Sequence, residues 1–275
     1  MKIYYNMKKS LLLLAGLLML CPAMHAFRQK EINIRSEKMD KDVPVTVITP
    51  DGYRKGKAFP VVYLLHGFSD NHTGWAKKGV VGELSDLYKI IFVLPDGGYD
   101  SWYFDSEFTP EYQYETFVSS ELVTYVDSNY KTIKDRKGRA ITGLSMGGHG
   151  AMFLGIRHQD IFGSMGSLSG GVDFRPFPTK WGIAKRIGSK DEYPENWEKN
   201  TVINLTHLLK PEAMNIIIDC GSEDFFYEVN CSLHKKLLEE KIPHEFYSRP
   251  GKHNWDYWLN AIKYQVLFFN DCFRK

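Results

Sequence analysis

The sequence predicts an α/β fold in which a mostly parallel, doubly wound sheet of about eight strands carries helices on both faces. Short, continuously apolar runs recur along the chain, as at 61–65 and 90–94. Such runs are typical of strands that are buried on both faces of a parallel sheet. The segments between the later runs show the apolar spacing of helices, and alternating strands and helices favour a doubly wound architecture.

The candidate elements follow each other in this alternation. The predicted strands are 31–35, 43–49, 61–65, 90–94, 140–144, 164–168, 215–219 and 244–248. The first two are so close in sequence that we expect them to pair antiparallel. The predicted helices cover 116–126, the residues after 147, the segment around 229–237 and 255–269. Two long segments, 97–114 and 171–211, break the rhythm, and loops of this length in a compact domain are usually functional.

The first 26 residues have the features of a secretory signal. Three lysines precede the apolar run 11–20, which is too short to span a bilayer as a helix, and small residues follow at Ala23 and Ala26. We therefore expect 1–26 to be a signal peptide and 27–275 to be one domain exported to the periplasm or the outside. Lipid anchoring through Cys21 is the alternative, although the residues before it lack the small side chain of such sites.

Net charge excludes one class of function. The chain carries a formal charge of +2, which falls to −1 without the three leader lysines, so bulk electrostatics argue against a nucleic-acid binder. Three cysteines remain after the leader, Cys220, Cys231 and Cys272, too few for a disulfide framework. We expect free thiols, with a Cys220–Cys231 pair as the alternative.

Ser145 is the candidate nucleophile. Residues 143–147 read Gly-Leu-Ser-Met-Gly, between an apparent strand and an apparent helix. A serine on such a sharp turn is exposed above the sheet, and the helix N-terminus favours an anion beside it. The flanking glycines are needed because the helix passes close to neighbouring strands. The alternative is a glycine-rich turn with an inert serine.

A serine hydroxyl needs a base and an orienting acid, and in this architecture they follow it in the order acid, then histidine. The segment after strand 215–219 contains Asp224, and the segment after strand 244–248 contains His253. Asp224 and His253 are therefore the candidate acid and base. Glu223 and Asp173 remain alternatives for the acid.

Backbone N–H groups are the candidate oxyanion donors. His66, Gly67 and Phe68 follow the strand 61–65, and we assign the two donors to the N–H groups of Phe68 and Met146. His66 is expected to brace its loop by hydrogen bonds and not to act as the base. Five aromatic residues could form a platform for the substrate, namely Trp102, Tyr103, Trp181, Trp197 and Trp255. Of these, Trp102 and Tyr103, in the loop after strand 90–94, are the candidate substrate-binding residues, while Trp197 and Trp255 are expected to pack in the core.

The chain resembles the esterase D-like α/β hydrolases, which include tributyrin, feruloyl and acetylxylan esterases, S-formylglutathione hydrolases and mycolyltransferases. The resemblance spans about 40–270 and rests on motifs in the family's order, namely those at 63–71, 95–98, 101–103, 143–148, 221–225 and 251–255. It implies the α/β-hydrolase fold with Ser145 as nucleophile, Asp224 as acid and His253 as base. The mycolyl-transferring branch differs, because it has Glu as the acid.

These observations predict an exported serine carboxylesterase. The resemblance and the leader favour short-chain acyl or hydroxycinnamoyl esters as substrates, including esters on plant polysaccharide fragments. No cofactor is expected, and the sequence contains no metal-binding or nucleotide-binding motif. The alternatives are an acyltransferase, in which an alcohol replaces water, and a catalytically idle binding protein on the same fold.

Overall fold

The computed structural model describes residues 27–53, 57–210 and 213–275. Within these ranges eight strands form one sheet, in the order β1-β2-β4-β3-β5-β6-β7-β8. Their bounds are β1 Arg28–Ser36, β2 Lys41–Thr49, β3 Val61–Leu65, β4 Ile91–Pro95, β5 Arg139–Gly143, β6 Ser164–Leu168, β7 Asn215–Gly221 and β8 Glu245–Arg249.

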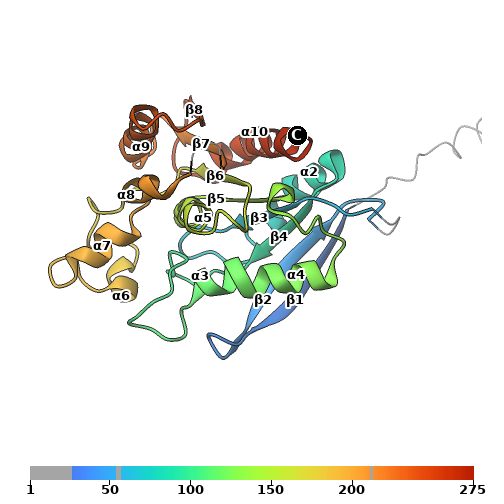
Figure 1. Ribbon diagram of the computed structural model, residues 1–275, viewed down its shortest axis with the longest axis horizontal. Helices are drawn as coiled ribbons and strands as arrows, with labels where there is room; N and C mark the ends of the chain where they lie inside the picture. The colour runs from blue at the N-terminus through green and yellow to red at the C-terminus, as the bar shows by residue number, and fades with distance from the viewer. Residues whose placement is uncertain (1–26, 54–56, 211–212) are drawn as a thin grey trace, which may run out of the picture.

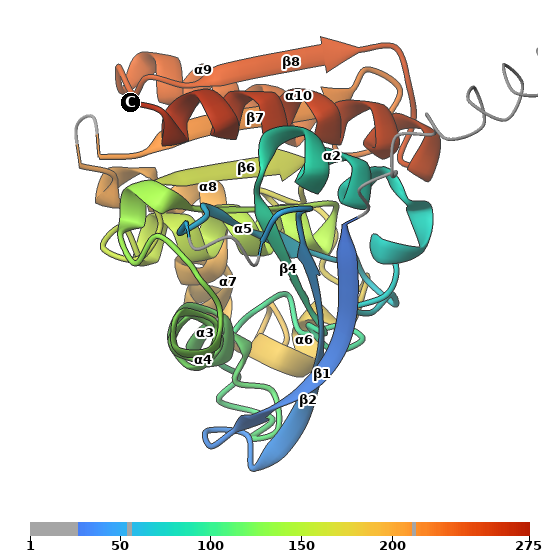
Figure 2. The same ribbon diagram turned by 90° about the vertical axis from the view of Figure 1, so that its right-hand side faces the viewer.

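The sheet begins as an antiparallel hairpin and continues as a parallel sheet. β1 pairs antiparallel with β2, β2 pairs antiparallel with β4, and all the later pairs are parallel. Figure 2 shows the long β1–β2 hairpin extending away from the rest of the sheet. Because β3 to β8 run in the same direction, their carboxyl ends lie along one edge, where loops can bring distant residues together.

Helices connect the strands and cover both faces of the sheet (Figure 1). Their bounds are α2 Val80–Tyr88, α3 Tyr114–Thr116, α4 Leu122–Asn129, α5 Met146–Arg157, α6 Ile183–Ile187, α7 Pro194–Asn200, α8 Val202–Leu205, α9 Tyr227–Glu239 and α10 Trp255–Phe273. A π-helical turn, Phe117–Glu121, joins α3 to α4. Helices α2 and α10 pack on one face, whereas α4, α5 and α9 pack on the other.

The alternation of side chains along each strand produces these two cores. In β3, Val61, Tyr63 and Leu65 join the core beneath α5, while Val62 and Leu64 join the core beneath α10. All five are at most 1% exposed. Full burial of such a side chain contributes roughly 1.5–3 kcal/mol, so a strand buried on both faces must be apolar throughout.

The predicted architecture is confirmed, with differences in the connections. All eight strands lie where they were expected, with β4, β5 and β8 displaced by about one residue, and the antiparallel start is present. Sequence analysis missed α2 and the short helices α6, α7 and α8, which occupy much of 171–211. Helices of four to seven residues show too few turns for an apolar period to be visible.

The predicted signal peptide, 1–26, with Cys21, lies outside the described residues. None of the helices in the described ranges combines the length and the apolar character that crossing a bilayer requires. Cys220, Cys231 and Cys272 are free cysteines.

Candidate active site

Ser145 occupies a strained turn between β5 and α5. Its backbone has φ 55° and ψ −116°, a conformation that L-residues rarely adopt. The surrounding sheet holds this turn in place, because the Ser145 N–H donates to the carbonyl oxygen of Leu168 at 2.9 Å. The turn places the serine at the N-terminus of α5, where unpaired N–H groups and the helix dipole favour negative charge.

Glycines on both sides of Ser145 are required by close backbone contacts. A Cβ on Gly143 would lie 2.6 Å from the carbonyl oxygens of Leu65 and Gly147, and one on Gly147 would lie 2.5 Å from those of Leu65 and His66. Because backbone atoms cannot move aside as a flexible side chain can, any larger residue would displace the turn. Glycine is therefore needed at both positions, because neighbouring backbone carbonyl groups occupy the space of a side chain.

The structure brings Ser145, His253 and Asp224 together from three different loops. His253 Nε2 lies 2.9 Å from Ser145 Oγ, and His253 Nδ1 lies 2.8 and 3.0 Å from the two carboxylate oxygens of Asp224. The carboxylate accepts the proton of Nδ1, which leaves Nε2 as the acceptor for the serine hydroxyl. This chain of hydrogen bonds can draw a proton away from Ser145 as its oxygen attacks a carbonyl carbon.

Asp224 contacts His253, whereas the two alternative acids, Glu223 and Asp173, contact other side chains. Asp224 is 6% exposed, and its Oδ1 also accepts from the N–H of Phe226 at 2.8 Å. Glu223 points outward and lies 3.8 Å from the Lys252 ammonium. Asp173 accepts from the Arg175 guanidinium at 2.8 Å. Of the three carboxylates, only Asp224 contacts His253.

The segment 66–68 passes directly beside the serine turn. A Cβ on Gly67 would lie 2.5 Å from the Leu144 side chain and 3.4 Å from Ser145 Cβ, so glycine allows this approach. The N–H groups of Phe68 and Met146 donate to no acceptor within the described ranges. Free N–H groups on the two sides of a nucleophile can bind a developing oxyanion.

His66 braces this segment, as expected. Its Nε2 accepts from the N–H of Gly97 at 2.7 Å, and its Nδ1 lies 2.8 Å from the carbonyl oxygen of Gly67. The ring is therefore the neutral tautomer with its proton on Nδ1. Complete burial lowers the pKa of His66 below its ordinary value. An imidazole that is buried and hydrogen-bonded at both ring nitrogens is a positioning group and not a general base.

Trp102 and Tyr103 require a correction. Both are predicted to bind substrate, yet they are 1% and 0% exposed, and neither lines the cleft at Ser145. Trp102 packs edge-on against His149, with 5.3 Å between ring centroids, and Tyr103 donates its hydroxyl proton to the carbonyl oxygen of His66 at 3.0 Å. They support the active-site loops from beneath, because residues 100–103 fold back into the core.

Other aromatic residues line the cleft instead. A cleft of about 640 Å³ opens over Ser145, and its walls include Trp181, Phe225, Trp255 and Trp258. Phe225 is 51% exposed and stacks on Trp181, with centroids 5.7 Å apart and an interplanar angle of 19°. Trp197 is buried as expected, but Trp255 belongs to the cleft and not to the core alone.

Sequence reasoning missed two features of the site. Phe225 and Trp181 form a wall because the acid loop and the segment 171–211 meet in space. Phe225 ends the motif at 221–225 but was not assigned to the substrate, and Trp181 was one of five aromatic residues considered for it. The second feature is buried Asp219, which accepts hydrogen bonds from Tyr257 and Arg249. This network ties β7 to the end of β8 and to the first turn of α10. Burial raises the pKa of Asp219 despite these two partners.

In the described part of the chain, His, Cys, Asp and Glu side chains form no group of three or more that could hold a metal ion.

Comparison with known proteins places the chain among esterases. The sequence profile of the family described as "Putative esterase" matches residues 36–269. An acetyl esterase of Caldicellulosiruptor saccharolyticus is 27% identical over 252 residues, which cover 84% of this chain and 94% of that protein. The diacylglycerol acyltransferase/mycolyltransferase Ag85A of Mycobacterium leprae is 36% identical over 275 residues, which cover 84% of this chain and 80% of that protein.

A solved ferulic acid esterase superposes with a TM-score of 0.79 at 27% identity, covering 90% of this chain and 98% of its own. The strand order and the helices on both faces, together with this superposition, identify the α/β-hydrolase fold.

Proposed function

The chain belongs to this esterase family and is a carboxylic-ester hydrolase, and we propose that it works through Ser145, His253 and Asp224. The observation that carries the proposal is the unbroken series of hydrogen bonds from Ser145 Oγ through the imidazole to the Asp224 carboxylate. Because the relatives support a carboxylic-ester hydrolase, they argue against the alternative of a catalytically idle binding protein.

The proposed reaction proceeds through an acyl-enzyme. Ser145 Oγ attacks the ester carbonyl while His253 Nε2 takes the hydroxyl proton, and the N–H groups of Phe68 and Met146 bind the oxyanion. His253 then gives that proton to the departing alcohol. Water enters, His253 removes a proton from it, and the acid is released as Ser145 recovers its proton. Asp224 holds the tautomer of His253 and stabilises the imidazolium formed in each half.

We propose a hydroxycinnamoyl or short-chain acyl ester as the substrate, carried on a plant polysaccharide fragment. The exposed ring of Phe225 lies 4.2 Å from the His253 ring, centroid to centroid, so a planar acyl group bound at Ser145 would lie against it. The names of the relatives, an acetyl esterase and a ferulic acid esterase, agree with both acyl classes.

Hydrolysis of p-nitrophenyl acetate and butyrate by residues 27–275 tests the proposed catalytic residues. Ser145→Ala should lower turnover by several orders of magnitude, because the nucleophile is lost. Ser222→Ala is the matched control, since Ser222 lies exposed on the acid loop outside the hydrogen-bonded series, and it should keep at least half the activity. Comparable losses in both variants would contradict the assignment.

Acyl transfer is the second candidate function. It is favoured by the 36% identity to a protein named diacylglycerol acyltransferase/mycolyltransferase. The same acyl-enzyme would then be attacked by an alcohol in place of water. Adding an acceptor sugar during p-nitrophenyl ester turnover decides between them, because transfer produces an acylated sugar and hydrolysis produces only the free acid.

Export remains part of the proposal. It rests on the basic and apolar character of residues 1–26. Expression of the full chain in a bacterium, followed by N-terminal sequencing of the periplasmic protein, should find Phe27 as the first residue. Lipid on Cys21 would instead support the anchored form.

A further inference from the structure

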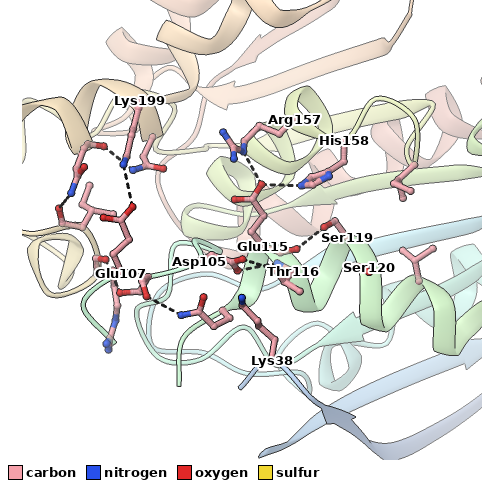
Figure 3. Close-up of a pocket in the computed structure, with 18 of the residues that line it drawn as sticks. Lys38, Asp105, Glu107, Glu115, Thr116, Ser119, Ser120, Arg157, His158 and Lys199 are labelled. Carbon is pink, nitrogen blue, oxygen red and sulfur yellow. Dashed lines mark hydrogen bonds and ion pairs between the residues drawn. The ribbon is translucent and has the colours of Figure 1, made fainter. Parts of the chain in front are cut away.

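A second cavity lies at the opposite end of helix α5 from Ser145. Its volume is about 860 Å³, within the roughly 300–1,000 Å³ typical of ligand pockets. Its walls come from the end of α5, the segment 105–124, helix α7 and Lys38 in the β1–β2 turn (Figure 3). The twelve residues of α5 span about 18 Å, so this cavity is separate from the catalytic cleft.

The charged side chains of this cavity are balanced in number. Four of the eight pair with one another, and Arg186 pairs with Asp100, which is not part of the lining. Four lysine or arginine residues and four carboxylates line it. Glu115 accepts from Arg157 at 2.7 Å and lies 2.9 Å from His158 Nε2, while Lys199 lies 3.4 Å from Glu107 (Figure 3). A charged ligand would have to compete with these pairs, so the lining favours an uncharged one.

Three side-chain amides give the cavity fixed hydrogen-bond acceptors. Each donates a hydrogen bond from its NH₂ group to a backbone carbonyl oxygen at 2.8 Å. Gln113 donates to Ser106, Asn196 donates to Ile187, and Asn200 donates to Asn196. Their carbonyl oxygens accept no hydrogen bond within the described part of the chain, and all three side chains line the cavity. Oxygen acceptors held in this way select a ligand that donates hydrogen bonds, as hydroxyl groups do.

An aromatic surface stands beside these acceptors. Phe108 lines the cavity and is 41% exposed, and Tyr193 packs against it edge to face, with 4.9 Å between ring centroids. Exposed aromatic rings are costly to leave in water, and the negative ring face attracts the C–H groups of a sugar ring. A sugar also presents hydroxyl groups around its edge, which match the amide acceptors.

We propose that this cavity is a non-catalytic binding site for a neutral oligosaccharide. A sugar chain held there would leave the Ser145 cleft free, so the enzyme would remain attached to a polymer while its ester bonds are cut. The binding itself does not depend on the proposed chemistry at Ser145, and it is measured with unesterified sugars.

Calorimetric titration of the wild-type protein with xylohexaose, cellohexaose and mannohexaose tests the site. At least one should bind saturably without inhibiting p-nitrophenyl acetate hydrolysis. Phe108→Ala should weaken that binding by about tenfold, the equivalent of losing about 1.4 kcal/mol of contact, and should leave ester turnover unchanged. Tyr264→Ala is the matched control, because Tyr264 is 43% exposed on α10, outside the cavity, and should bind like the wild type.

A second pair of variants separates loss of an acceptor from a change in the helix. Asn200→Ala removes an acceptor and its bond to the carbonyl four residues earlier, and Asn129→Ala removes the same kind of bond from α4, outside the cavity. Only Asn200→Ala should weaken binding. The proposal is overturned if no hexasaccharide binds, if Phe108→Ala and Asn200→Ala bind normally, or if the bound sugar inhibits ester hydrolysis competitively.

Discussion

A histidine in contact with a carboxylate lies at each end of helix α5, and only one of these pairs faces a serine hydroxyl. At the start of the helix, His253 bonds Asp224 on one side and Ser145 on the other. Beyond its last turn, His158 contacts Glu115, but no hydroxyl lies on its other nitrogen among the described residues. The first pair can pass a proton onward, whereas the second forms a closed ionic cluster with Arg157.

The difference teaches that titratable side chains alone do not make a catalytic site. The strained turn at Ser145 presents an oxygen to the imidazole, and the neighbouring N–H groups of Phe68 and Met146 are left free for an oxyanion. At the far end the carboxylate already has two donors, so this region can stabilise the fold or surround a ligand but has no group to transfer.

Exchanging the two histidines for glutamine gives the largest expected contrast. His253→Gln should lower kcat on p-nitrophenyl acetate by about 10⁴-fold or more, because no base remains. His158→Gln should change kcat less than about twofold. Steady-state kinetics on both purified variants measure this, with circular dichroism to establish folding. Similar losses at both positions would remove the distinction between the two ends.

The acid comes next in size. Asp224→Asn should lower kcat by about 10³–10⁴-fold, since an amide cannot stabilise the imidazolium. Glu223→Gln, on the neighbouring exposed residue, should remain within about twofold of the wild type. The same ester assay applies to both. Near-normal activity in Asp224→Asn would transfer the role of the acid to another carboxylate.

The exposed aromatic residues at the two ends should differ in substrate selectivity. Phe225→Ala should lower kcat/KM for methyl ferulate by about tenfold, the size expected for removing one aromatic contact, and affect p-nitrophenyl acetate much less. Phe108→Ala, at the far cavity, should change neither. Equal losses on both esters in Phe225→Ala would mean that the ring supports His253 and does not contact the acyl group.

His149, in the middle of α5, should make stability depend on pH. Its ring is fully buried among aromatic side chains, and burial lowers its pKa to about 3. Since the folded-state pKa lies below that of the unfolded chain, this group's contribution is complete above pH 6.5 and is lost as pH falls. Between pH 7 and pH 5 the loss is about 2 kcal/mol.

Urea unfolding of the wild type and of His149→Met at both pH values isolates the contribution of His149 to the pH dependence of stability, because methionine does not titrate. The wild type should lose more stability on acidification than the variant does. Parallel losses in the two proteins would refute the assignment to His149.

The cluster at the far end should have the smallest effect. Burial opposes ionisation of Glu115, but hydrogen bonds from His158 and Arg157 outweigh it and hold the pKa below its ordinary value of 4.5. Its contribution is therefore present above pH 4.5 and is lost as pH falls through the folded-state pKa. Glu115→Gln should destabilise the protein by about 1 kcal/mol at pH 7.

Repeating the unfolding below pH 4 should show wild type and Glu115→Gln converging. A difference that persists in acid would indicate a packing effect and not a charge effect.

The sequence predicted those parts of the molecule that depend on local pattern or chain order. Strands such as Val61–Leu65 must be apolar throughout, and the serine turn requires glycines at fixed positions, so both leave a signature. Asp224 follows β7 and His253 follows β8, and this chain order was sufficient to suggest both residues. Neighbouring Glu223 follows β7 as well and was therefore an equal candidate for the acid. In the structure the Asp224 carboxylate points to His253, whereas that of Glu223 points outward, and no residue pattern encodes the direction of a side chain on a loop.

The aromatic residues show the limit more sharply. Trp102 and Tyr103 were predicted to face substrate, while Phe225, the last residue of the motif at 221–225, was not assigned to the substrate. Whether a loop aromatic is buried or exposed depends on segments distant in sequence, such as 171–211, that fold over it or leave it open. The far cavity is likewise made from several segments that are distant in sequence, none of which carries a motif.

Covalent labelling of the active site tests the central claim most directly. A fluorophosphonate reacts with an activated serine and leaves a stable phosphonyl group on its oxygen. Incubated with the wild-type protein, it should modify Ser145 alone, as read by peptide mass spectrometry, while esterase activity falls in proportion. Labelling of a different residue in step with the loss of activity, or full activity after complete labelling of Ser145, would contradict the account.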